Sequence, residues 1–208
     1  MRRGRFITFE GIEGVGKSTN IDFVSGIIEA SGHTVMKTRE PGGTPIAERI
    51  RHILKEHGDE PLPDVAELLL LFAARSINVN NAIRPALDRG TWVISDRYTD
   101  STRAYQGGGR GFPRDSIEWL ADFVHGDVQP DLTILLDAPV ETAMGRADRR
   151  GDLDRFEVER AEFFERVRHT YLELAEREPG RFAVVDCRRD LEAVQAAIRR
   201  VVTPLLSE

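Results

Sequence analysis

The sequence predicts an α/β fold in which a parallel sheet of five strands is covered by helices on both faces. Three observations support this prediction. Short runs of β-branched and aromatic residues alternate along the chain with segments of helical length. The runs are almost wholly apolar, which suits strands that are buried on both faces. The first run passes through a glycine-rich turn directly into a helical pattern, as in a unit of strand, loop and helix.

The apolar runs are the predicted strands, and the segments between them are the predicted helices. The strands are residues 6–9, 34–36, 92–94, 132–136 and 182–185. The helices are residues 17–31, 44–57, 64–89, 114–125, 139–148, 155–178 and 190–206, several of which have apolar residues at three- and four-residue spacing. Residues 107–111 contain four glycines and predict a loop that closely approaches another part of the chain. A sheet of this kind binds ligands at the carboxyl ends of its strands.

The composition favours one soluble domain over residues 1–208, because 40% of the residues are hydrophobic and 31% are charged. The formal net charge of −6 disfavours a nucleic acid polymer as a partner. The longest apolar run, residues 68–74, is far shorter than the roughly 20 residues of a membrane helix. We see no signal peptide and expect a cytoplasmic protein without a membrane partner. Cys187 is the single cysteine, so an internal disulfide is excluded.

Residues 11–18 match the phosphate-loop pattern G-x-x-x-x-G-K-[ST] and lie between the first strand and the first helix, as in the P-loop NTPase fold. In such a loop, backbone N–H groups converge on phosphate oxygens, Lys17 bridges the β- and γ-phosphates, and Ser18 ligates Mg²⁺. The predicted ATP-binding residues are Gly11, Ile12, Glu13, Gly14, Val15, Gly16, Lys17, Ser18 and Thr19. The chain has no N-K-x-D guanine motif, and its size favours a small kinase over a motor.

The third strand leads into Asp96 and Arg97, at the sheet edge that also holds the phosphate loop. We assign Asp96 to the magnesium shell and Arg97 to the phosphate of an acceptor, since a planar guanidinium can hold two oxygens at once. The alternative is an ordinary ion pair at the end of a strand. A phosphate acceptor is already ionised at neutral pH, whereas an alcohol acceptor would favour a carboxylate base such as Glu13 or Asp96.

Several further motifs follow one another in order. They are FEGIEG (9–14), TREPGGT (38–44), DRY (96–98), STRAYQG (101–107) and PDLT (130–133). In sequence and spacing they resemble the bacterial thymidylate kinase family over residues 5 to about 180. The resemblance implies a nucleoside monophosphate kinase that uses ATP and Mg²⁺ to phosphorylate thymidine monophosphate, and a homodimer.

The resemblance also implies roles for particular residues. Glu13 would meet the 3′-hydroxyl of the sugar, and Arg97 would hold the acceptor phosphate with help from Arg39. The peptide bond before Pro41 is often cis in the family. Tyr105 would crowd the C2′ position and favour deoxyribose. Ser101 and Gln106 would lie near the base, although Tyr105 and Gln106 could also be plain helix-face residues.

Base recognition departs from the family pattern. Family members commonly carry an aromatic residue four positions before an arginine on one helix. Here Leu71 has that position, and Phe72 lies three before Arg75. We predict that Arg75 meets a carbonyl of the base and that Phe72 stacks on the ring, with core packing as the alternative role of Phe72.

Residues 146–156 are predicted to form a short lid, because Arg146, Arg149, Arg150 and Arg155 surround a glycine. An arginine that arrives on closure would stabilise the charge on the transferred phosphoryl group. We expect Arg149, Arg150 or Arg155 to have this role, because the phosphate loop contains no arginine. The alternative is a solvated charged face. For the whole chain, the alternatives are another deoxynucleotide or nucleoside kinase, or a P-loop protein that binds ATP as a switch.

Overall fold

The computed structural model describes residues 3–56, 60–148 and 161–207, and within them the side chains of 147, 148 and 207 are not considered. Its sheet consists of β1 (Phe6–Glu10), β2 (Val35–Arg39), β3 (Trp92–Asp96), β4 (Leu132–Asp137) and β5 (Phe182–Asp186). The order is β2-β3-β1-β4-β5, and every neighbouring pair is parallel. The predicted α/β fold with five parallel strands is therefore confirmed.

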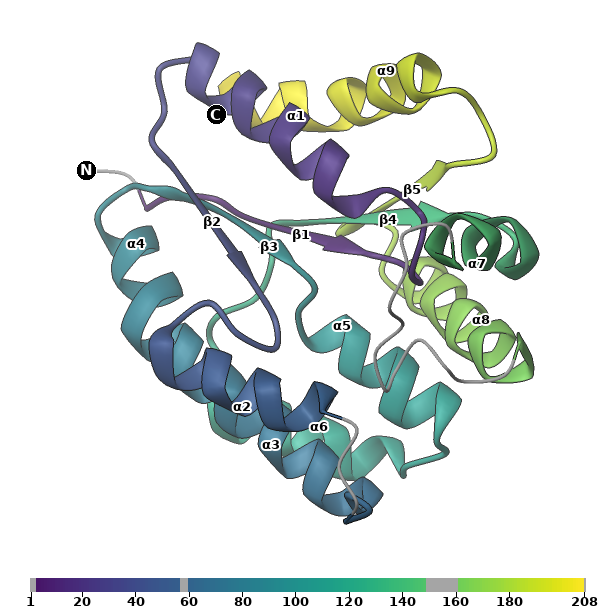
Figure 1. The fold of residues 1–208 in the computed structure, drawn as a ribbon. Coiled ribbons are helices and arrows are strands. Elements are labelled where there is room, and N and C mark those ends of the chain that lie inside the picture. The colour runs from purple at the N-terminus through teal and green to yellow at the C-terminus, as the bar shows by residue number, and fades with distance from the viewer. Residues whose placement is uncertain (1–2, 57–59, 149–160, 208) are drawn as a thin grey trace.

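The helices flank this sheet on both sides (Figure 1). They are α1 (Lys17–Ala30), α2 (Pro45–Lys55), α3 (Asp64–Asn78), α4 (Arg84–Asp88), α5 (Thr99–Thr102), α6 (Arg114–His125), α7 (Val140–Asp148), α8 (Ala161–Arg177) and α9 (Leu191–Val202). Two π-helices, η1 (Val79–Ile83) and η2 (Arg103–Gly109), and the 3₁₀-helix η3 (Thr203–Ser207) complete the described elements. In Figure 1, α1 and α9 lie on one side of the sheet and α4, α5 and α8 on the other.

The central strand β1 is buried along its whole length. Ile7 and Phe9 belong to the larger apolar core, which includes residues of α1, α8 and α9. Phe6 faces the other side and packs edge-on against the ring of Tyr98, with ring centroids 5.0 Å apart. Burial of one such side chain contributes about 1.5–3 kcal/mol. Because β1 has buried side chains in both apolar clusters, it holds both layers of helices to the sheet.

The predicted helix 64–89 is one continuous helical path with a change of register. It consists of α3, the π-helix η1 and α4. Pro85, which has no N–H group to donate, lies at the start of α4, directly after the π-helical turn. A π-helical turn contains about one more residue than an α-helical turn. The side chains of α4 therefore point in directions that are rotated relative to those of α3.

The prediction of a loop at residues 107–111 is wrong in part, because η2 continues through Gly109. The predicted close approach is present. A methyl group built on Gly109 would lie 2.7 Å from Cζ of Phe163 on α8, and one on Gly108 would lie 2.8 Å from Cβ of Thr170. The glycines therefore allow two helices to touch, which is a different use from a turn.

The amino end of α2 shows how the sequence fixes a boundary near the site. Thr44 is extended, and its hydroxyl accepts a hydrogen bond of 3.4 Å from the amide of Ala47. Pro45 follows at the first helical position, where its fixed φ suits the helix. Within the described residues, no helix has the length and apolar content that crossing a membrane requires.

A glycine replacement tests the contact between η2 and α8. Gly109→Ala should lower the free energy of unfolding by about 1–3 kcal/mol, because the methyl group overlaps the buried ring of Phe163. Gly26→Ala in α1 is the matched control. Nothing lies within 4 Å of its added methyl group, and it should be neutral or stabilising by about 1 kcal/mol. Urea unfolding of both variants gives the comparison, and equal effects would show that the contact is loose.

Candidate active site

The phosphate loop connects β1 to α1 at the carboxyl edge of the sheet. Gly11, Gly14 and Gly16 have φ angles of 131°, 77° and 92°, a region that side chains other than glycine rarely adopt. Gly16 precedes α1, and no side chain caps the first amides of that helix. These amides and the positive end of the helix dipole form a site for an anion.

Lys17 lies over this loop with its ammonium group turned inward. Its Nζ donates hydrogen bonds of 3.1 and 3.0 Å to the carbonyl oxygens of Gly11 and Ile12. Burial, together with the positive charge of Arg97, lowers the pKa of Lys17 to about 8, against the opposing effect of nearby carboxylates. An anion bound in the loop would supply the negative charge that the buried ammonium lacks.

Arg97 connects the loop with three other elements. It is the one residue other than glycine with a positive φ, 71°, in the described chain. Its Nη1 donates to the Gly11 carbonyl at 3.0 Å, and its Nη2 donates to Glu13 at 2.7 Å and to the Tyr105 hydroxyl at 3.0 Å. Such a strained backbone persists only where surrounding contacts hold it. The guanidinium is therefore positioned before any ligand arrives.

The buried carboxylate of Glu10 binds the residues that surround Arg97. It accepts hydrogen bonds from the Tyr98 amide at 2.7 Å, the Ser101 hydroxyl at 2.6 Å and the Tyr171 hydroxyl at 2.8 Å. Burial, and secondly the charge of Asp100, raises the pKa of Glu10 to about 7. Nη1 of Arg97 reaches the same two hydroxyls at 3.2 and 3.3 Å. Sequence reasoning missed Glu10 and Tyr171 as parts of the site.

Arg75 forms a second preorganised guanidinium on α3. Its Nε donates to Glu40 at 2.6 Å, and its Nη2 donates to the Tyr98 carbonyl at 3.2 Å and to Thr102 Oγ1 at 3.0 Å. Nη1 is buried and has no hydrogen-bond partner within the described part of the chain. Glu40 precedes a cis peptide bond to Pro41, as the resemblance implies. Since an unpaired buried donor is costly, Nη1 is a group that a ligand can satisfy.

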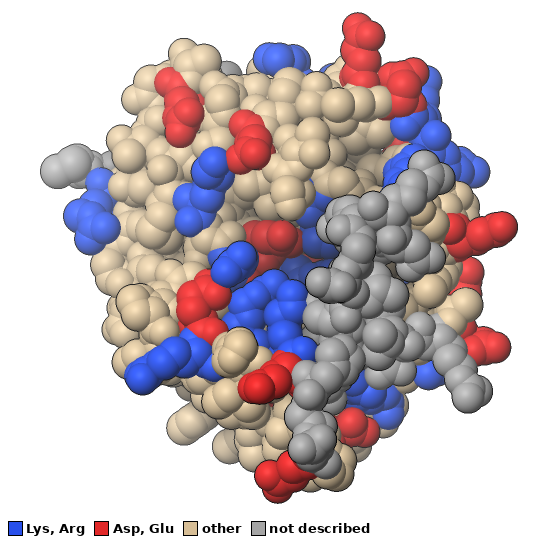
Figure 2. Space-filling model, in the orientation of Figure 1, with Lys and Arg blue, Asp and Glu red and all other residues tan. Residues whose placement is uncertain are grey.

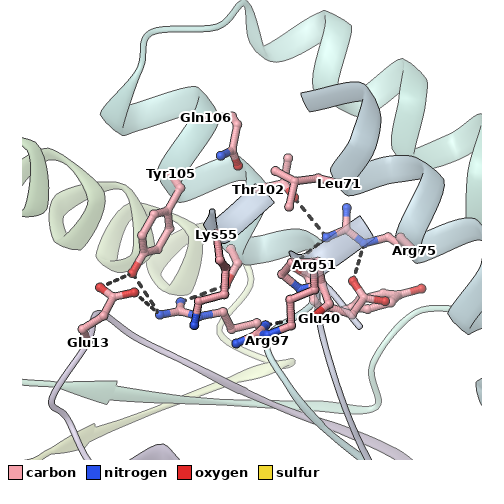
Figure 3. A pocket seen from close by; sticks show the side chains of 13 residues that line it. Glu13, Glu40, Arg51, Lys55, Leu71, Arg75, Arg97, Thr102, Tyr105 and Gln106 are labelled. Carbon is pink, nitrogen blue, oxygen red and sulfur yellow. Dashed lines mark hydrogen bonds and ion pairs between the residues drawn. The ribbon is translucent and has the colours of Figure 1, made fainter. Parts of the chain in front are cut away.

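These residues surround the pocket shown in Figure 3. Its empty space, including the solvent at its mouth, is about 610 Å³. We call it the inner cavity. Its lining consists of Glu13, Glu40, Pro41, Arg51, Lys55, Leu71, Arg75, Arg97, Tyr98, Ser101, Thr102, Tyr105 and Gln106. The inner cavity therefore combines two preorganised arginines with aromatic and aliphatic walls.

A second, larger pocket lies over the phosphate loop, and we call it the outer cavity. Its empty space, including the solvent at its mouth, is about 1180 Å³. It is lined by Glu13, Gly14, Gly16, Lys17, Ser18, Thr19, Arg39, Arg51, Lys55, Asp96, Arg97 and Arg146. Figure 2 shows basic side chains gathered in the hollow of this face. Glu13, Arg51, Lys55 and Arg97 border both cavities, so a ligand in one lies next to a ligand in the other.

Most of the residues predicted from the sequence line one of these cavities. Gly11, Ile12 and Val15 of the loop are exceptions. The side chains of Ile12 and Val15 are buried in the core, so these two residues can offer only their backbone. Arg39 lines the outer cavity and is bound by Glu48 through two hydrogen bonds of 3.0 and 2.8 Å. Arg146 donates to the Cys187 carbonyl at 3.2 Å. The predicted lid residues Arg149, Arg150 and Arg155 lie outside the described residues.

Phe72 does not line the inner cavity. It packs with Leu68, Ile117 and Ala121 in a cluster between α3 and α6, and the guanidinium carbon of Arg75 lies 4.9 Å from its ring centroid. Leu71 takes the place on the wall. One residue corresponds to a rotation of about 100° on a helix, so only one of the two neighbours can face the cavity. The structure thus corrects the prediction of a stacking Phe72.

Arg51 and Lys55 of α2 border both cavities and were not predicted. Nη1 of Arg51 donates to the carbonyl of Pro41 at 2.9 Å. The two residues are four apart, so they lie on one face of the helix. This spacing was the sequence signal that could have indicated a second basic contribution.

The outer cavity also offers groups that fit a divalent cation. Oδ1 of Asp96 is buried without a hydrogen-bond partner in the described part of the chain, and Ser18 lines the same cavity. The described residues contain no cluster of three or more possible protein ligands from His, Cys, Asp and Glu. One carboxylate and one hydroxyl suit Mg²⁺, which keeps several waters and shares phosphate oxygens in kinase sites.

A phosphate loop with a buried lysine, adjoining a cavity that holds preorganised arginines, defines a P-loop phosphotransferase acting on a small phosphorylated acceptor. The family model described as thymidylate kinase matches residues 9–198. The chain is 56% identical to a thymidylate kinase of Chromohalobacter salexigens, with 100% of the chain and 99% of the relative covered. It therefore belongs to the thymidylate kinase family.

Two further comparisons agree. A thymidylate kinase of Pseudomonas syringae pv. tomato is 52% identical, with 98% of the chain and 97% of the relative covered. The crystal structure of thymidylate kinase from Ehrlichia chaffeensis has a TM-score of 0.76 and 34% identity, and covers 97% of this chain and 99% of its own. The similarity extends over nearly the full length of each protein.

The pKa of Lys17 predicts how ATP binding depends on pH. In the free protein Lys17 loses its proton at about pH 8, whereas bound phosphates stabilise the charged form. The Kd for ATP should therefore be constant below about pH 7 and rise toward tenfold per pH unit above about pH 8.

Isothermal titration calorimetry between pH 6.5 and 9.5 measures this dependence. Lys17→Arg is the matched control, because a guanidinium keeps its charge throughout this range and should leave Kd nearly independent of pH. A wild-type Kd that is flat up to pH 9.5 would contradict the lowered pKa.

Proposed function

We propose that this protein transfers the γ-phosphate of ATP to thymidine monophosphate and forms thymidine diphosphate. The observation that carries the proposal is the inner cavity beside the phosphate loop. It presents Arg97, which touches the loop at Gly11, and Arg75, whose buried Nη1 lacks a partner in the described structure. One guanidinium suits the phosphate of a nucleotide and the other suits a carbonyl of its base.

The donor ATP is assigned to the outer cavity. The amides after Gly11 and at the start of α1 would hold its phosphates, and Lys17 would turn from the loop carbonyls to the β- and γ-phosphates. We propose that Ser18 and Asp96 hold Mg²⁺, consistent with the unpartnered Oδ1 of Asp96. Bound there, the ion would neutralise charge on the β- and γ-phosphate oxygens.

The acceptor phosphate is assigned to Arg97, with Arg39 and Arg51 as further cations at the same wall. A phosphate monoester is largely ionised at neutral pH, so its oxygen needs no general base. The protein's contribution is alignment and neutralisation of charge between two anions. Glu13 is then free from a role as base, and we assign it to the 3′-hydroxyl of the sugar.

The sugar and base are assigned to the remaining walls. The Tyr105 hydroxyl donates to Glu13 at 2.7 Å, and the guanidinium carbon of Arg97 lies 4.8 Å from its ring centroid. We propose that the ring, held by these contacts, occupies the space that a 2′-hydroxyl would need. Leu71 packs on the base, Nη1 of Arg75 donates to a base carbonyl, and Ser101 and Gln106 complete the pocket.

Further parts of the proposal concern features outside these contacts. We propose that residues 146–156 form a lid and that Arg149, Arg150 or Arg155 reaches the transferred phosphoryl group, with Arg146 already at the rim of the outer cavity. The single domain, the homodimer and the cytoplasmic location stay predictions of the sequence.

ADP release in the presence of ATP and Mg²⁺ tests the function. Each natural nucleoside monophosphate is offered separately, with thymidine and with no acceptor as controls. Turnover should be fastest with thymidine monophosphate. Release without any acceptor would favour an ATP-dependent switch, and faster turnover of thymidine would favour a nucleoside kinase.

The role of Tyr105 gives a prediction about sugar selectivity. The wild-type protein should have a much higher kcat/KM for thymidine monophosphate than for its ribose counterpart, because Tyr105 leaves no room for a 2′-hydroxyl. Tyr105→Ala should narrow this preference, whereas Tyr105→Phe keeps the ring and should retain most of it. Steady-state kinetics on both acceptors measures the ratio. The same ratio in wild type and Tyr105→Ala would remove Tyr105 from the sugar site.

A further inference from the structure

Gln106 presents one side of its amide to the inner cavity and the other to a buried carboxylate. It lies on η2 and is 2% exposed. Its side chain is among those that line the cavity in Figure 3. Its Nε2 donates a hydrogen bond of 2.8 Å to Oε1 of Glu67 on α3. No hydrogen bond links its amide oxygen to another described residue. An ionised carboxylate only accepts hydrogen bonds, so the nitrogen of Gln106 must face Glu67 and the oxygen must face away.

Arg110 holds Glu67 in this state. Its Nε donates to Oε1 of Glu67 at 2.9 Å, and its Nη2 donates to Oε2 at 3.3 Å. The side chain of Glu67 is fully buried, and that of Arg110 is 14% exposed. The guanidinium carbon of Arg110 also lies 5.5 Å from the ring centroid of Phe163, which fixes it from the α8 side. The paired guanidinium and the ring together hold the carboxylate of Glu67 in place beside Gln106.

A reversed Gln106 amide would be strongly disfavoured. Its oxygen would then lie against a carboxylate oxygen, with one hydrogen bond lost and two acceptors in contact. The polarity of the amide is therefore set by Glu67 and does not depend on a ligand. The lining of the inner cavity therefore offers a hydrogen-bond acceptor, the amide oxygen of Gln106, and a hydrogen-bond donor, Nη1 of Arg75.

We propose that Glu67, fixed by Arg110, is a positioning residue that selects the base by locking the amide polarity of Gln106. This inference rests on the proposed function and extends it to a residue that does not line the cavity. Thymine and uracil present an N3–H donor next to a carbonyl acceptor, which match the Gln106 oxygen and the Arg75 donor. Cytosine instead presents an acceptor at N3 next to a donor amino group. Its N3 would face the Gln106 oxygen, and its amino group would face the Arg75 donor, so both hydrogen bonds would be lost.

The first test compares thymidine monophosphate with deoxycytidine monophosphate. Glu67→Gln keeps the shape of the side chain but can donate or accept, so Gln106 becomes free to reverse. The ratio of kcat/KM for the two acceptors should fall at least tenfold, mainly through a higher KM for thymidine monophosphate, with kcat nearly unchanged. A ratio within about threefold of wild type would overturn the proposal.

A double-mutant cycle separates positioning from a general structural effect. Gln106→Ala removes the amide and should itself lower the ratio. Glu67→Gln added to Gln106→Ala should then change the ratio by less than about threefold. An equal drop in both backgrounds would mean that Glu67 acts on the fold, and an unchanged ratio in Gln106→Ala alone would show that Gln106 does not read the base. Either result overturns the proposal.

The two proposals can fail separately. If the wild-type protein does not phosphorylate thymidine monophosphate, the proposed function fails. If it does so with a high ratio that Glu67→Gln leaves intact, only the positioning role fails. Thermal unfolding of each variant identifies one that is not folded, and Gln106→Ala still tests the reading of the base if Glu67→Gln does not fold.

Discussion

The buried carboxylate of Glu10 is the interaction on which the geometry of the site depends. Its oxygens bind the amide after Arg97, a hydroxyl of α5 and a hydroxyl of α8, so one residue at the end of the central strand joins three elements. Arg97 adopts its left-handed backbone between these anchors. Leaving a buried polar group of this kind without a hydrogen-bond partner typically costs about 1–3 kcal/mol. The fold therefore stabilises a local conformation that Arg97 would not adopt alone.

The sequence predicted the sheet well where burial is continuous and less well elsewhere. Strands β1 and β4 are buried along most of their length, so their apolar runs are unmistakable. The edge strand β2 continues to Arg39, three residues beyond the predicted end, because its outer side chains reach solvent and Lys37 and Arg39 interrupt the apolar run. The π-helices were not predicted. A change from four- to five-residue hydrogen bonding within a helix has no residue pattern that marks it in the sequence.

The site was predictable where its residues are contiguous. The phosphate loop and the residues after β3 form short motifs whose spacing follows from the chemistry of phosphate binding. Tyr171 lies 161 residues from Glu10, and only packing of α8 brings them together. The choice between Leu71 and Phe72 depends on a helix rotation that apolar spacing does not fix, because both residues suit a core. Glu67 was not predicted, because its contact with Gln106 joins residues that are 39 apart in the sequence.

With the nucleotides placed as in the proposed function, the shared wall of the two cavities couples their binding. Glu13, Arg51, Lys55 and Arg97 face whatever occupies either side. An anion in one cavity neutralises part of the positive charge that attracts an anion to the other cavity. Linkage requires that this influence be mutual, so the first nucleotide changes the affinity of the second by the same factor that the second changes the first. After the proposed transfer, each cavity would hold a diphosphate. The repulsion between the two products across this wall would then favour their release.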